Sequence, residues 1–182
     1  ILIRIFGVGR EKKITIPEQA TILEIAPRTS LGSMLQFDGA KSRRNMRLGY
    51  YDAMRMLYGL EGKIYYIEQN KEECYYLKQL IELRPEVFEL LFENCRPERE
   101  SRGVLRSYME MVLPQIAAEL KLGGGWNYKT LYLAILEASA RLMRIGKFRI
   151  YTVEELAAAV RKKAADNGTP EGLPGFVRII LN

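Results

Sequence analysis

The chain has 182 residues, of which 48% are hydrophobic and 27% charged, the composition of one globular domain, alone or with a small appendage, and not of a disordered chain. No apolar run approaches the roughly 20 residues that a membrane-spanning helix needs, so we expect no membrane partner. The chain has no histidine, which excludes Ser-His-Asp and Cys-His catalysis and most zinc sites.

Basic residues outnumber acidic ones, with 28 Lys and Arg against 22 Asp and Glu and a net charge of +6. Such an excess favours a polyanionic partner such as nucleic acid. Arginine and lysine concentrate in residues 41–55, whereas glutamate dominates residues 68–93. This segregation of charge fits an oriented binding surface better than uniform solubility.

Cys74 and Cys95 are the two cysteines. Two thiols in a chain large enough to fold unaided predict a reducing compartment, and hence a cytoplasmic location. Because two thiols without histidine make a poor ligand set, we expect no metal and no cofactor.

The amino-terminal segment predicts a β-hairpin over residues 1–16, followed by a short helix over residues 18–26 that starts after Pro17. Strand, turn, strand and the run IPEQATILEIA together resemble the opening of β-grasp modules of the ubiquitin-like and TGS type. The resemblance spans residues 1–27, contains no catalytic motif and implies no function. It suggests that residues 1–40 form a hairpin–helix appendage. Residues 41–182 are then a mainly helical domain, separate from that appendage or continuous with it.

Hydrophobic periodicity and the positions of proline and glycine predict six further helices. They cover residues 42–58, 70–83, 86–95, 99–121 (bent or broken at Pro114), 127–145 and 153–166. Short strands are predicted near residues 62–68, 147–151 and 176–181. The predicted fold class is α+β, a mostly helical body with an N-terminal β-hairpin and these short strands.

Two glycine motifs invite a phosphate-binding interpretation. Gly7-Val8-Gly9 lacks the third glycine and the following helix of a dinucleotide loop, so a hairpin turn explains it better. Residues 123–130 lack the second glycine and the preceding strand of a P-loop, which favours a helix cap and link. A looser role remains open, in which the first amides of helix 127–145 and Lys129 contact a phosphate of nucleic acid.

Helix 127–145 is predicted to be a core helix with one exposed stripe. Five of its polar residues fall within one arc at 100° per residue, and nearly all the rest are apolar. That stripe holds Lys129, Thr130, Glu137, Arg141 and Arg144. Glu137 and Arg141 are spaced as an i,i+4 ion pair.

Helix 42–58 carries the sharpest pattern. One arc, predicted to face the core, holds Met46, Tyr50, Ala53, Met54 and Leu57. Another arc alternates arginine with tyrosine, which suits phosphate pairing and base stacking. Together with neighbouring cations, it gives the predicted binding residues Lys41, Arg43, Arg44, Arg47, Tyr51, Arg55, Tyr58 and Lys129. A solvated basic helix whose tyrosines pack on a neighbour, or one that fits an acidic protein groove, would show the same pattern.

Three classes of function remain open. The first is a non-enzymatic nucleic-acid-binding protein, with DNA favoured over RNA. The second is a protein-binding adaptor, or an inhibitor of a nucleic-acid enzyme, that uses the same surface. The third is a histidine-free enzyme, for which no pair of carboxylates at one site offers an acid and a base. We therefore expect no catalytic residues.

Overall fold

The computed structural model describes residues 2–3, 24–25, 31–32, 38–93, 103–168 and 172–182. The chain divides into two compact units, Ile1–Leu60 and Glu61–Asn182. Helices predominate in the described residues, with two short pairs of parallel strands. The broad α+β class is therefore confirmed. The unit division places helix 42–58 in the first unit, and the grouping of residues 41–182 as one domain stays a prediction.

The first unit contains α1 (Gly39–Tyr58), β1 (Leu2–Ile3) and β2 (Glu24–Ile25). Asp38 caps α1, since its carboxylate accepts hydrogen bonds from the backbone N–H groups of Ala40 and Lys41. Gly59 ends the helix in the left-handed conformation, at a φ of 63°.

The prediction for the amino-terminal segment is corrected where the structure describes it. β1 pairs with β2, and the two strands run parallel. β2 lies beyond residue 16, so it is not the second strand of the predicted hairpin. Glu24 and Ile25 are extended, although they fall inside the predicted helix 18–26. A nine-residue helix is marginal without tertiary support, so strand pairing outweighs the local preference here. The turn of the predicted hairpin and its second strand lie outside the described residues.

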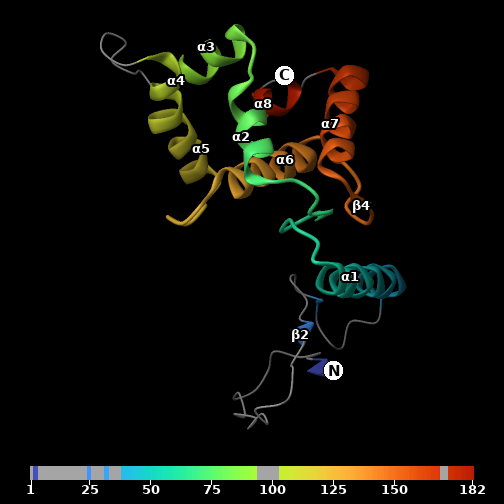
Figure 1. Ribbon diagram of the computed structural model, residues 1–182. Coiled ribbons are helices and arrows are strands. Elements are labelled where there is room, and N and C mark those ends of the chain that lie inside the picture. The colour runs from blue at the N-terminus through green and yellow to red at the C-terminus, as the bar shows by residue number, and fades with distance from the viewer. Residues whose placement is uncertain (1, 4–23, 26–30, 33–37, 94–102, 169–171) are drawn as a thin grey trace, which may run out of the picture. The chain divides into compact units, whose positions relative to one another are not determined.

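The second unit is built around α6 (Tyr128–Leu142), which packs against three other helices, α2 (Glu73–Ile81), α7 (Val153–Asn167) and α8 (Val177–Leu181) (Figure 1). α3 (Pro85–Glu93) packs against η1 (Tyr108–Val112). Side chains of these elements form one continuous hydrophobic core, with Leu131, Ile135 and Leu136 of α6 fully buried in it. The predicted core role of helix 127–145 is thus confirmed.

The predicted helix 99–121 is split into α4 (Val104–Ser107), η1 and α5 (Leu113–Glu119), and its first residues lie outside the described ranges. The helical backbone is continuous through these segments, and its irregularity falls next to Pro114, where a bend or break was predicted. Proline has no N–H to donate to the preceding turn, and η1 relaxes there into a π-helix, in which Leu113 N–H donates to the carbonyl of Tyr108.

Two predicted strands are present in shortened form. β3 (Tyr66–Ile67) and β4 (Ile150–Tyr151) pair in parallel, with Tyr66 opposite Ile150. The third, residues 176–181, is wrong, because this segment forms α8. A short run of buried β-branched residues fits a strand and a buried helix equally well. Here Val177, Ile179 and Ile180 are buried where α8 packs on α6 and α7.

No helix in the described part of the chain is long and apolar enough to span a bilayer.

Candidate nucleic-acid interface on helix α1

The exposed side of α1 is the side that the sequence pattern assigns to the core. Met46 is 69% exposed and Tyr50 is 59% exposed, while Leu48, Asp52 and Arg55 are buried. Arg43 and Arg47 lie among the apolar residues of the exposed side. Burying two unpaired guanidinium groups costs far more free energy than exposing a methionine and a tyrosine, so this side faces water.

Four cations on the first turns of α1 are exposed, and we call them the basic face: Lys41, Arg43, Arg44 and Arg47. The first turn of α1 contains no acidic residue. Cations at a helix N-terminus are unfavourable, because the helix dipole places positive partial charge there. Asp38 offsets part of this cost as the N-cap. The basic face therefore gathers positive charge at the end of the helix that is least suited to hold it.

Arg55 lies apart from the basic face. Its guanidinium Nη1 is 3.5 Å from Oδ1 of Asp52, and Arg55 is only 6% exposed. Both members of this intrahelical ion pair are buried, so Arg55 does not present its charge on the surface. The sequence pattern placed Arg55 outward because angular position alone does not show that the side of α1 that carries Asp52 and Arg55 is covered.

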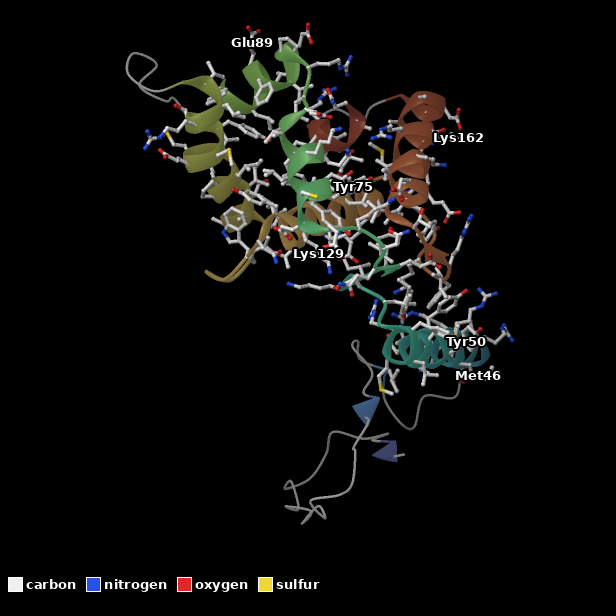
Figure 2. All side chains as sticks on the ribbon, in the orientation of Figure 1. Met46, Tyr50, Tyr75, Glu89, Lys129 and Lys162 are labelled. Carbon is white, nitrogen blue, oxygen red and sulfur yellow. The ribbon has the colours of Figure 1, made fainter. Side chains whose placement is uncertain are left out.

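Tyrosine rings accompany the basic face along α1. Tyr58 is exposed and Tyr51 is half-buried. The rings of Tyr50 and Tyr51 meet edge to face, with their centroids 5.2 Å apart, which restrains both. Figure 2 labels Tyr50 and Met46 on the helix. The structure thus exposes Tyr50, which the sequence pattern assigned to the core.

Lys129 belongs to the second unit, and it is engaged there. Its Nζ lies 2.7 Å from the carboxylate of Glu61. The backbone N–H groups of Tyr128 and Lys129 donate to Glu73, and that of Thr130 donates to the side chain of Asn127. A phosphate at this helix N-terminus would have to displace both side chains.

Glu137 is not part of an exposed stripe, and its predicted exposure is wrong. It is 5% exposed, and its carboxylate accepts hydrogen bonds from the backbone N–H groups of Lys63, Ile64 and Tyr65. Three donors satisfy a buried carboxylate that would otherwise be costly to desolvate. The sequence did contain a signal for the burial of Glu137, since it is the one charged residue in the largely apolar run Leu133–Ala140.

Cys74 is an exposed free thiol, and Cys95 lies outside the described residues. Within the described ranges no group of three or more Cys, Asp or Glu side chains is placed to hold a metal ion.

Comparison with known proteins gives no further information about the site. No protein-family model matches the chain, and no match was found to a curated protein or to a solved structure.

Proposed function

We propose that the chain is a non-enzymatic nucleic-acid-binding protein that contacts the phosphate backbone through the basic face of α1. The observation that carries this proposal is the exposure of all four of these cations on the first turns of one helix, with no acid in its first turn. Arginine pairs with phosphate oxygens bidentately, and lysine adds a point charge.

The electrostatic cost of the basic face supports a polyanionic ligand. Like charges on neighbouring turns repel one another, and the helix dipole adds to that repulsion. A phosphate backbone brought against the face relieves both effects and releases its own condensed counterions. Binding of this kind depends on charge and is largely independent of base sequence.

The tyrosines on α1 extend the proposal to single strands. Tyr51 lies one turn after Arg47 on α1 and is half-buried, and Tyr58 is exposed on the last turn of the helix. An aromatic face next to arginine is the usual platform on which an unpaired base stacks. Duplex DNA engages the cations alone, whereas single-stranded DNA engages the rings as well.

One observation favours a protein partner as a second candidate. Met46 and Leu57 are exposed on the same side of α1 as Arg43 and Arg47. An apolar strip flanked by arginine fits an acidic amphipathic segment of another protein. An adaptor or an inhibitor of a nucleic-acid enzyme would use α1 in this way.

Fluorescence anisotropy distinguishes the two candidates. Labelled duplex DNA, single-stranded DNA and RNA are each titrated with the chain at several salt concentrations. Nucleic-acid binding predicts saturable binding that weakens steeply as salt rises. Absence of binding to all three probes at low salt would favour the protein partner.

A further inference from the structure

The second unit contains a cavity that is lined by none of the residues of α1. It has a volume of about 630 Å³ and is lined by α3, α7, α8 and the residue before α3. This volume is within the range of small-molecule sites. Three arginines, one from each of three separate segments, line it: Arg84, Arg161 and Arg178.

Among the described residues, the acidic lining neutralises only part of the positive charge of this cavity. Glu86 is the one acidic residue that lines it. In the part of the chain that the structure describes, none of the three arginines takes part in an ion pair. Three guanidinium groups and one carboxylate give the lining a charge of +2. A phosphate monoester carries a charge close to −2 at neutral pH and so balances it.

Two of the arginines are held in place by hydrogen bonds that leave their outer nitrogens free for a ligand. Nε of Arg161 donates to the carbonyl of Ile180 at 2.8 Å. Nε of Arg84 donates to Oδ1 of Asn182 at 3.2 Å, and the backbone N–H of Arg84 donates to the same oxygen. Each guanidinium contact uses Nε, so the Nη1 and Nη2 groups keep their donors. Side chains fixed beforehand lose less conformational entropy when an anion binds.

The remaining wall of the cavity is apolar. It consists of Val87, Leu90, Ala164, Ala165 and Leu181. Leu90 is among the large hydrophobic residues that remain exposed. An inorganic anion would leave this wall in water, whereas a ligand with an apolar body would cover it.

We propose that this cavity binds a small organic phosphate monoester, with the phosphate on Arg84, Arg161 and Arg178 and an apolar body against the α3 and α7 side chains. This site goes beyond the proposed function, because it uses none of the residues of α1.

Isothermal titration calorimetry of the whole chain tests the proposal with three probes: 1-naphthyl phosphate, inorganic phosphate and 1-naphthol. We expect 1-naphthyl phosphate to bind at one site, at least about tenfold more tightly than inorganic phosphate, since it covers the apolar wall. The neutral 1-naphthol should show no measurable binding, since it lacks the charge.

Arg178→Ala is the informative variant, because the Arg178 side chain makes no hydrogen bond or ion pair with the described residues, and the fold should be kept. It should weaken 1-naphthyl phosphate about tenfold or more. Lys162→Ala is the matched control: Lys162 is an exposed cation on α7 that does not line the cavity (Figure 2). The affinity of Lys162→Ala for 1-naphthyl phosphate should stay within about twofold of that of the unmodified chain.

Three results would overturn the proposal: no saturable binding of 1-naphthyl phosphate, equal affinity for inorganic phosphate, or equal losses in Arg178→Ala and Lys162→Ala. The double variant Arg44→Ala/Arg47→Ala should bind 1-naphthyl phosphate normally. The cavity proposal is tested by the binding of 1-naphthyl phosphate, and the proposal for the basic face is tested by the binding of nucleic acid. The failure of one can therefore be distinguished from the failure of the other.

Discussion

The carboxylate of Glu137 accepts a hydrogen bond of 2.7 Å from the backbone N–H of Tyr65, 72 residues earlier in the chain. The same carboxylate binds the N–H groups of Lys63 and Ile64. It thereby fixes the loop between α1 and β3 onto the central helix α6. Successive N–H groups that converge in this way form a concave anion site, and here the chain fills it with its own side chain.

Replacing Glu137 should destabilise the second unit strongly. Glu137→Ala leaves three N–H groups without their acceptor, and we expect a loss of about 3 kcal/mol or more in the free energy of unfolding. Glu137→Gln keeps one acceptor oxygen and should lose less. Chemical denaturation followed by circular dichroism measures both. Glu119→Ala, at an exposed position on α5, is the control, and an equal loss there would contradict the assigned role.

Gly62 should tolerate no side chain. Its φ is +90°, and a Cβ there would lie 2.7 Å from both the Glu137 carboxylate and the carbonyl of Tyr65. Gly62→Ala should therefore cost about 2 kcal/mol in the free energy of unfolding. Gly123→Ala, where a Cβ meets nothing within 4 Å, should be close to neutral. Thermal melting compares the two variants, and similar melting temperatures would argue against the tight loop.

Buried tyrosines should make the fold sensitive to alkali. Burial raises the pKa of Tyr65 and Tyr76 to about 12, and it also raises the pKa of Tyr108 and Tyr132. Above about pH 10 the unfolded chain ionises these phenols while the folded chain keeps them neutral, so stability is complete below pH 10 and falls as the pH rises toward 12.

Absorbance at 295 nm, recorded with circular dichroism during an alkaline titration, checks this prediction. Part of the tyrosine signal should appear only at the pH where helical structure is lost. Complete ionisation near pH 10 with the helices intact would show that these hydroxyls are accessible.

Arg55 should matter for stability and not for binding. Arg55→Ala leaves Asp52 buried without its cationic partner, which typically costs about 3 kcal/mol. Its effect on the salt dependence of nucleic-acid binding should be small, since its charge is not on the surface. Parallel denaturation and anisotropy measurements on Arg55→Ala and Arg47→Ala separate the two roles. If Arg55→Ala flattened the salt dependence of binding without loss of stability, the result would contradict the structural role and show that Arg55 contacts nucleic acid.

Local signals predicted the helices well where capping and breaking residues are explicit. Thr152 and Glu155 form a capping box at the start of α7, and Gly59 ends α1. Periodicity also identified α6 as a core helix. These features depend on residues close together in sequence, which is why the sequence alone reveals them.

Features that depend on tertiary partners were not predictable in the same way. The buried side of α1 depends on what covers it, and Leu48 with the Asp52–Arg55 pair occupies that side. The burial of Glu137 depends on a loop more than seventy residues away. The cavity arginines come from positions 84, 161 and 178, and no local pattern connects them.

The salt dependence of DNA binding tests the central claim most directly. Duplex DNA affinity is measured by anisotropy across a salt series for three chains: unmodified, Arg44→Ala/Arg47→Ala, and Lys162→Ala/Lys163→Ala, which removes the same charge from an exposed part of α7. Each phosphate contact contributes about −0.9 to the slope of log affinity against log salt. We predict that the α1 variant flattens this slope by about two and that the α7 variant leaves it nearly unchanged. Equal slopes in all three chains, or a larger change in the α7 variant, would contradict binding through the basic face.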